Sequence, residues 1–147
     1  MKSKEREIIK VSVMAEAPVD EVWKLWTCPD HITRWYFASD DWHAPRVKND
    51  LIEGGRFKIR MEARDGSEGF DFKGTYTSIV TFMHIAYTLI DGRKVVTEFR
   101  SVNGSTIVTQ RFEAEDINPT ELQREGWQAI LNNFASYVRK NKSAFRA

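Results

Sequence analysis

The sequence predicts an α+β domain in which a curved antiparallel sheet of about six or seven strands wraps around a long C-terminal helix, with two short helices after the first strand. Residues 47–115 alternate between apolar and polar side chains and are divided by glycine-containing turns, as in an antiparallel meander. Residues 118–140 carry one apolar stripe at helical spacing. A sheet with one apolar face and a helix with one apolar stripe bury both by packing together.

The N-terminal part predicts a strand and then two short helices. Residues 8–16 alternate as a strand does. Pro18 suits the first turn of a helix, and Pro29 restarts a second helix after a joint near Cys28. Residues 37–50 contain turn formers and show no period, so we expect a loop there.

The central part predicts consecutive hairpins. Residues 56–63, 69–76, 94–100 and 105–113 alternate between apolar and polar side chains. Asp-Gly and Asn-Gly pairs favour tight hairpins because both residues accept positive φ. The turn signals are Gly54-Gly55, Asp65-Gly66, Asp91-Gly92 and Asn103-Gly104.

The last segment has the features of a capped helix. Asn118 is a good N-cap, Pro119 suits the first helical position, and Glu121 completes a start that resembles a capping box. A helix that runs to about Lys140 is about 33 Å long at 1.5 Å per residue, enough to cross a small sheet. Gly126 costs about 0.5–1 kcal/mol relative to alanine inside a helix. Close approach to the sheet, or room for a ligand, would each account for it.

Length and charge restrict the class of protein. A chain of 147 residues makes one ordinary domain, so we expect a single domain over residues 1–147 with an ordered core at about residues 8–141. The 22 basic and 21 acidic residues leave a formal charge of +1, without the basic excess of a nucleic-acid-binding face. Nucleic acid is therefore not an expected partner.

Cysteine and histidine content argue against a disulfide or a metal centre. The single cysteine, Cys28, cannot form an intramolecular disulfide or a four-cysteine zinc site, which fits a reducing, cytoplasmic location. The three histidines show no metal-ligating spacing. No apolar run resembles a signal peptide or approaches the roughly 20 residues that cross a bilayer. We expect no cofactor, no metal and no membrane partner.

The aromatic content raises the question of a hollow interior. Five Trp, nine Phe and four Tyr must either fill a thick core or line a cavity, since each large ring buries about 150–250 Å². If the interior is hollow, its lining comes from inward positions of the strands and the long helix. These are Phe57, Met61, Phe70, Phe72, Tyr76, Phe99, Trp127, Ile130 and Phe134.

The stretch from Trp35 to His43 supplies candidate entrance residues. Trp35 and Phe37 follow the second helix, and Trp42 and His43 lie in the loop that is expected next. Loops on a rigid scaffold often carry binding groups. We therefore place Trp35, Phe37 and Trp42 at the mouth of a ligand cavity, with His43 beside them and ordinary packing as the alternative.

Polar side chains on the apolar face would orient a ligand. Gln110 shares its strand face with Val108 and Phe112, so its amide is predicted to be buried and to need a partner. Tyr76 and Tyr87 are expected to present hydroxyls to the same interior.

The chain contains no compact acid–base motif. Cys28 near a helix N-terminus, with His31 three residues on, could form a nucleophilic pair, but a lone cysteine usually packs as a small apolar residue. Glu98 alternates with inward Phe99 and is expected on the solvated face. No catalytic residue is predicted. An enzyme that uses a tyrosine, His43 or Glu98 for proton transfer is the alternative.

Five motifs occur in the order typical of a known family and cover nearly the whole chain. They are "APVDEVWKLWTCPDHITRWY", "NDLIEGGRFKIRMEARDG", "FKGTY", "YTLIDGR" and "EGWQAILNNFASYV". With its Trp-Thr-x-Pro segment, its Gly-Gly before a strand and its Gly-Trp in the last helix, the chain resembles the START-like (SRPBCC) superfamily. More narrowly, it resembles a stand-alone member of the domain family named after the activator of heat-shock-protein-90 ATPase. The resemblance implies the helix-grip fold, which Bet v-like proteins share.

The resemblance also implies a cavity between the sheet and the C-terminal helix. Members of the superfamily hold lipids, polyketides, hormones and aromatic compounds there, and a few catalyse cyclisation or condensation. This chain would then be a soluble protein that binds a small hydrophobic or aromatic molecule. The chaperone activators carry a second domain for which 147 residues leave no room. Chaperone activation is therefore not the expected function. A chaperone-associated, stress-response interaction module is a further alternative, and the chain could form a homodimer.

Overall fold

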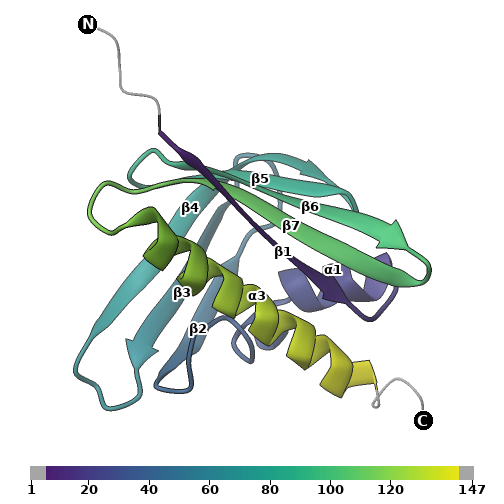
Figure 1. The fold of residues 1–147 in the computed structure, drawn as a ribbon, viewed down its shortest axis with the longest axis horizontal. Helices are drawn as coiled ribbons and strands as arrows, with labels where there is room; N and C mark the ends of the chain where they lie inside the picture. The colour runs from purple at the N-terminus through teal and green to yellow at the C-terminus, as the bar shows by residue number, and fades with distance from the viewer. Residues whose placement is uncertain (1–5, 143–147) are drawn as a thin grey trace, which may run out of the picture.

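One seven-stranded antiparallel sheet curves around the helices in the computed structural model, which describes residues 6–142 (Figure 1). The strand order is β1-β7-β6-β5-β4-β3-β2, so β2 to β7 form a meander and β1 lies beside β7. This is the predicted α+β helix-grip fold. In chain order the elements are β1 (Ile8–Ala15), α1 (Val19–Thr27), α2 (Pro29–Ile32), β2 (Trp42–Asn49), β3 (Arg56–Ala63), β4 (Gly69–Val80), β5 (His84–Leu89), β6 (Lys94–Val102), β7 (Ser105–Glu113) and α3 (Thr120–Lys142).

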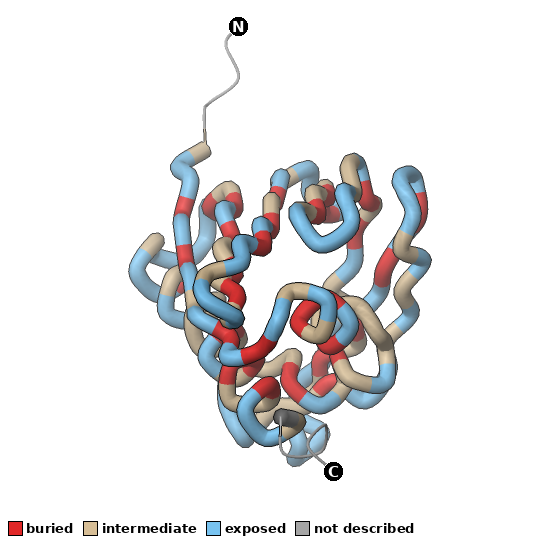
Figure 2. The backbone as a smooth tube through the Cα atoms, turned by 90° about the vertical axis from the view of Figure 1, so that its right-hand side faces the viewer, coloured by how far each residue is buried: buried red, intermediate tan, exposed pale blue. Residues whose placement is uncertain are grey.

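The period-two pattern of the strands places apolar side chains on the inner face of the sheet. In β7, Val108, Gln110 and Phe112 are buried, as predicted, and the residues between them are more exposed. Figure 2 shows this alternation along the strands. The hairpin between β6 and β7 turns at Asn103 and Gly104, which have φ of 50° and 82°, and this explains why the sequence has Asn-Gly there.

The segment predicted as a loop, residues 37–50, contains strand β2, and that prediction is wrong for residues 42–49. β2 pairs with β3 in antiparallel register, with a shift between His43 and Arg46. Pro45 lies at this shift, where its missing N–H removes no ladder hydrogen bond. The irregularity interrupts the period-two pattern, and β2 is an edge strand, so the sequence does not show the usual strand signal.

The two short helices are confirmed. α1 begins directly after Pro18 and buries Val22, Trp23 and Leu25. Cys28 ends α1 and precedes α2, which has Pro29 at its first position. A proline there keeps the chain turning without the loss of a hydrogen bond, because the first N–H groups of a helix have no partner within the helix.

The long helix α3 begins one residue later than predicted. The carbonyl of Pro119 accepts the first helical hydrogen bond, from the Gln123 N–H at 3.2 Å. The side-chain amide of Gln123 donates to the carbonyls of Asn118 and Glu115, at 2.8 and 3.2 Å, and accepts from the Glu115 N–H at 2.9 Å. Gln123 therefore ties the helix to the preceding loop, in place of the capping expected from Asn118.

The apolar stripe of α3 packs along β1 and closes one edge of the sheet. Leu131, Phe134 and Val138 are almost fully buried. The Gln128 amide donates to the Ser12 carbonyl at 2.8 Å and accepts from the Ser12 N–H at 3.4 Å. This side chain pairs with the free edge of β1, where open backbone groups would otherwise invite another strand. None of the helices in the described chain is long and apolar enough to cross a membrane.

Gly126 is not explained by close approach of α3 to the sheet. A Cβ atom at this position would meet no heavy atom within 4 Å. At Gly55 a Cβ would lie 2.2 Å from the backbone oxygen of Asp50, so the turn before β3 requires glycine. A side chain at position 55 would therefore overlap the backbone, whereas position 126 has room for one.

We expect Gly126→Ala to raise the free energy of unfolding by about 0.5–1 kcal/mol, because alanine loses less backbone entropy in a helix. Urea denaturation followed by circular dichroism measures this. Gly55→Ala is the matched control and should be clearly destabilised by the overlap with Asp50. A loss of stability in Gly126→Ala would show that the glycine is required.

Candidate functional site

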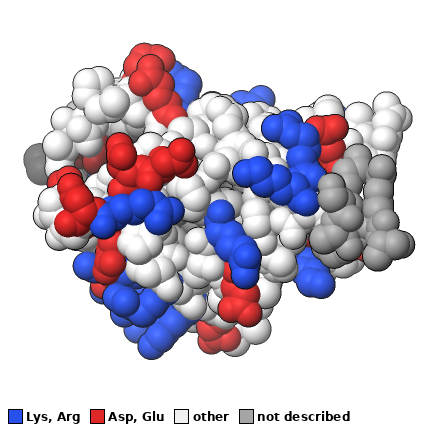
Figure 3. All heavy atoms as spheres, turned by 90° about the horizontal axis from the view of Figure 1, so that it is seen from below, with Lys and Arg blue, Asp and Glu red and all other residues white. Residues whose placement is uncertain are grey.

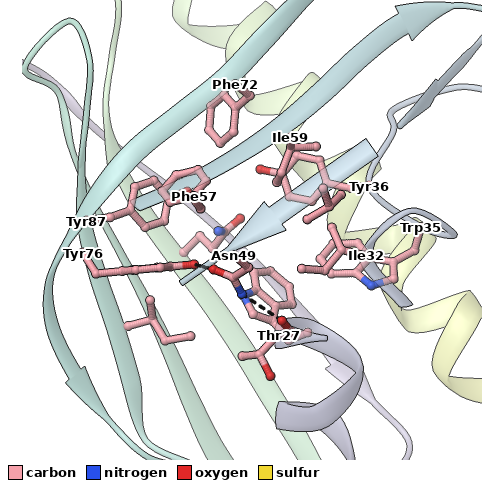
Figure 4. A pocket seen from close by; sticks show the side chains of 14 residues that line it. Thr27, Ile32, Trp35, Tyr36, Asn49, Phe57, Ile59, Phe72, Tyr76 and Tyr87 are labelled. Carbon is pink, nitrogen blue, oxygen red and sulfur yellow. Dashed lines mark hydrogen bonds between the residues drawn. The ribbon is translucent and has the colours of Figure 1, made fainter. Parts of the chain in front are cut away.

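A cavity lies between the inner face of the sheet, including β2, and the segment that contains the short helices α1 and α2 (Figure 4). Its volume is about 40 Å³, which is room for about three water molecules. Most of its walls are aromatic or aliphatic. The lining residues are Trp26, Thr27, Ile32, Trp35, Tyr36, Val47, Asn49, Phe57, Ile59, Phe72, Tyr76, Ile85, Tyr87 and Gln110.

The resemblance implied a cavity between the sheet and the C-terminal helix. The cavity in the structure is lined by no residue of α3. The Trp127 ring stacks on Phe112, with centroids 3.8 Å apart and planes within 10°. Phe134 packs against Trp26 and Trp35 at centroid distances of 5.0 and 4.6 Å. These rings fill the space between α3 and the sheet. The space that is left adjoins the two short helices.

Trp35 is a wall residue and not an entrance residue. It is only 1 % exposed, and its Nε1–H donates to the Leu25 carbonyl at 3.0 Å. A buried indole needs such a partner. The placement of Trp35 at a mouth is therefore corrected: the ring lies in the core and borders the cavity from inside.

Six of the fifteen residues predicted to contact a ligand line the cavity. They are Trp35, Phe57, Phe72, Tyr76, Tyr87 and Gln110. Ile59 was missed although it alternates with Phe57 along β3 and carries the same strand signal. Val47 and Asn49 were missed because β2 was predicted as a loop.

Three of the remaining candidates, Trp42, Met61 and Phe70, lie near the end of the sheet where β3 and β4 join, and a fourth, Phe37, contacts α3. The rings of Trp42 and Phe70 lie 6.0 Å apart, and Phe70 is 49 % exposed because it is next to the first residue of β4. Met61 is buried opposite Phe70. Phe37 is half-buried, and its carbonyl accepts from Asn133 at 3.4 Å. None of these four lines the cavity.

The other candidates contact helices or face outward. Phe99 packs under Trp23 with ring centroids 5.2 Å apart, and Ile130 is half-buried on α3. His43 lies on the outer face, with Nε2 3.8 Å from a carboxylate oxygen of Glu62. With Trp127 and Phe134, described above, these residues lie outside the cavity lining.

Polar side chains fasten the cavity walls to one another. The Tyr76 hydroxyl donates to Asn49 Oδ1 at 2.5 Å, and Asn49 Nδ2 donates to the Thr27 carbonyl at 2.8 Å (Figure 4). Gln110 Nε2 donates to Thr97 Oγ1 at 3.0 Å, which confirms the prediction that this buried amide needs a partner. The Asn49 amide joins β4, β2 and the end of α1.

Three phenols border the cavity and remain protonated. Burial raises the pKa of Tyr36, Tyr76 and Tyr87 well above the usual value of a tyrosine. A protonated phenol donates a hydrogen bond and cannot act as a base at neutral pH. Among the described residues that line the cavity there is no carboxylate, histidine, lysine or arginine. The cavity is therefore suited to hold a molecule by apolar contact and hydroxyl donors.

The other titratable residues considered for catalysis, which are not tyrosines, lie outside the cavity lining. Glu98 is exposed on the outer face beside Arg111, as predicted. His31 Nδ1 is 2.6 Å from the Tyr137 hydroxyl, so the imidazole is paired with α3 and not with Cys28. In the described part of the chain, no three His, Cys, Asp or Glu side chains form a cluster that could hold a metal ion.

The fold defines a helix-grip domain, and comparison with known proteins identifies its family. The family model described as "Activator of Hsp90 ATPase homolog 1-like protein" matches residues 16–139. The chain belongs to this family, as its motifs indicated. No match is found among the curated proteins.

Solved structures support the assignment. The chain is 42 % identical to the AHSA1-like protein from Aeromonas hydrophila, with a TM-score of 0.83 over 91 % of this chain and 94 % of that one. It is 44 % identical to Chr148 from Cytophaga hutchinsonii, with a TM-score of 0.79 over 95 % of each chain. NE0264 from Nitrosomonas europaea is 17 % identical with a TM-score of 0.79, over 92 % of this chain and 96 % of that one, a likeness of fold alone.

We expect Asn49→Ala to lower the free energy of unfolding by about 1–3 kcal/mol, because the Tyr76 hydroxyl and the Thr27 carbonyl lose their partner in a partly buried site. Tyr76→Phe should remove part of this loss when it is combined with Asn49→Ala, since the orphaned hydroxyl is then gone. Urea denaturation of both single variants and the double variant measures the coupling. Strictly additive losses would contradict the proposed link.

We expect the free energy of unfolding to fall as the pH is lowered from 7.5 to 5.5, because His31 becomes protonated more readily in the unfolded state. Burial, followed by the charges of Lys24 and Arg34, holds the pKa of His31 below its usual 6.5. The unfolded state then binds the proton more readily, so the stabilisation is complete above pH 6.5 and is lost as the pH falls towards the folded pKa. Melting temperatures at both pH values measure this. His31→Asn should reduce the decrease, whereas His43→Asn on the outer face should not. If the melting temperature of His31→Asn decreased as much as that of the wild type, His31 would not be the cause of the decrease.

Proposed function

We propose that the protein binds a small hydrophobic or aromatic molecule in the cavity between the sheet and the two short helices. The observation that carries the proposal is an unfilled space with apolar walls and a few fixed polar groups, which is the usual composition of a small-molecule site. The single cysteine and the +1 charge support a cytoplasmic protein without a nucleic-acid partner.

The cavity volume limits the ligand. Typical sites for drug-sized molecules measure about 300–1,000 Å³, whereas this cavity measures about 40 Å³. A single aromatic ring therefore requires one wall to move. Tyr36 is the wall residue best placed to do so, because it lies in the turn after α2 and outside the hydrogen-bonded ladder of the sheet. Its ring contacts Trp35 and Phe72, with centroids 5.2 and 5.9 Å apart.

The polar groups set the orientation of the ligand. The Tyr36 and Tyr87 phenols face the cavity, and both are protonated (Figure 4). Gln110 borders the same space from β7. These groups favour an aromatic molecule with one oxygen that accepts a hydrogen bond. Affinity comes mainly from apolar burial, at about 25 cal/mol per Å², and the site binds the molecule without a group suited to abstract a proton.

Phenol and toluene are matched probes for this site, because they differ by one hydroxyl at nearly equal size. In methyl-detected NMR titrations, phenol should shift the methyl signals of Ile59 and Ile85 in a saturable way. Gln110→Leu should weaken phenol binding by about threefold to tenfold and leave toluene binding nearly unchanged, as expected for one neutral hydrogen bond.

Val47→Phe fills the cavity and should abolish binding of both probes. Val96→Phe makes the same change on the outer face of β6 and is the control. Thermal melts of each variant separate loss of binding from loss of folding. If phenol shifts signals across the surface without saturation, or if a folded Val47→Phe variant binds as the wild type does, the proposal is wrong.

A further inference from the structure

Three lysines form a row across the outer face of the sheet. Lys48 of β2 is paired with Lys58 of β3, and Lys58 is paired with Lys73 of β4, so the three side chains lie directly opposite one another on adjacent strands. All three are exposed. Directly opposed residues have Cβ atoms about 4.5–5.5 Å apart, and like charges at this distance destabilise a sheet.

The nearby carboxylates do not neutralise this row. Within residues 6–142, none of the three lysines has a carboxylate within ion-pair distance. Glu62 is paired with Arg60 and Arg46, and Asp71 is paired with Arg60. These nearby carboxylates are thus already paired with Arg46 and Arg60. The lysine row is therefore not paired with carboxylates of the described chain.

Two grooves meet at this row. One, of about 260 Å³, is lined by Arg46, Lys48, Lys58, Arg60 and Asp71. The other, of about 670 Å³, shares Lys48 and Lys58 and adds Arg56, Lys73 and Ile90. Ile90 is 72 % exposed, so an apolar side chain stands in solvent at the margin of the basic surface. We name the surface formed by Lys48, Arg56, Lys58, Lys73 and Ile90 the lysine face.

We propose that the lysine face binds a short acidic segment of a partner protein, with glutamates or aspartates on the lysine row and an apolar side chain against Ile90. Charge complementarity supports this partner, because carboxylates placed on the row would pair with lysines that have no ion-pair partner in the described chain. The exposed isoleucine adds an apolar contact that a polyanion without apolar side chains does not use.

The extent of the basic surface argues for a protein segment and against a nucleic acid. Asp50 and Asp71 line the two grooves together with the basic residues, so the continuous basic surface is short. The face of the molecule in Figure 3 carries side chains of both signs. The formal charge of the chain is only +1. A broad basic face is the usual mark of a nucleic-acid-binding protein.

The lysine row points away from the cavity, although Phe57 lines both the cavity and the larger groove. Lys58 points outward between Phe57 and Ile59, which point inward along the same strand and line the cavity. A variant of Lys58 therefore changes the outer face and leaves the proposed ligand site in place. Failure of one proposal can be told from failure of the other by measuring phenol binding in the same variant.

The binding test uses fluorescence anisotropy with the fluorescein-labelled peptide EEELEEELEE in 50 mM salt. We expect saturable binding to the wild type that weakens as salt rises. Lys58→Gln should weaken it by about fivefold. Lys94→Gln is the matched control, because Lys94 is an exposed strand lysine opposite Thr88, and its effect should stay below about twofold.

Stability gives a second readout on the same variants. Lys58→Gln should raise the melting temperature by about 1–3 °C because it relieves the repulsion in the row, and Lys94→Gln should not. The proposal is overturned if the peptide does not bind, if Lys94→Gln weakens binding as much as Lys58→Gln does, or if QQQLQQQLQQ binds equally. It is also overturned if a ten-nucleotide oligothymidylate binds more tightly than the acidic peptide.

Discussion

The packing of Trp26, Trp35 and Phe134 is the contact on which the rest of the structure depends. Their ring centroids lie 4.6–5.0 Å apart, and the rings come from α1, from the turn after α2 and from α3. These elements share no sheet ladder, so side chains must hold them together. Each such aromatic pair contributes about 0.5–1.5 kcal/mol beyond its buried area. The cluster holds the short helices over the sheet and so determines where space is left unfilled.

Strand β2 connects the two proposed binding surfaces. Val47 and Asn49 point inward and line the cavity, while Lys48 between them points outward in the lysine row. Period-two alternation thus lets a single edge strand serve an apolar interior and a charged exterior. The same strand is held to α1 by the hydrogen bond from Asn49 to Thr27. The position of β2 is therefore set by the packing of the helices that it adjoins.

Much of the fold and part of the site could be predicted from the sequence, where the physics is local. Phe57, Phe72 and Tyr76 were assigned to the inner face because strand alternation depends only on neighbouring residues. The position of Trp35 depends on Phe134, about one hundred residues away, and no local pattern contains that contact. The turn between β4 and β5 has no glycine and places Phe82 at φ 67°, a conformation that bulky residues rarely adopt. Such features follow from tertiary packing and not from propensity.

The central claim is that the space under the short helices can admit a guest. A crystal structure determined under xenon pressure tests it most directly, because xenon enters small apolar cavities without the need for a specific hydrogen bond. The account predicts a xenon site enclosed by Tyr36, Ile59 and Tyr87. Side chains that close the space completely, or ordered waters that occupy it and exclude xenon at every pressure, would contradict the account.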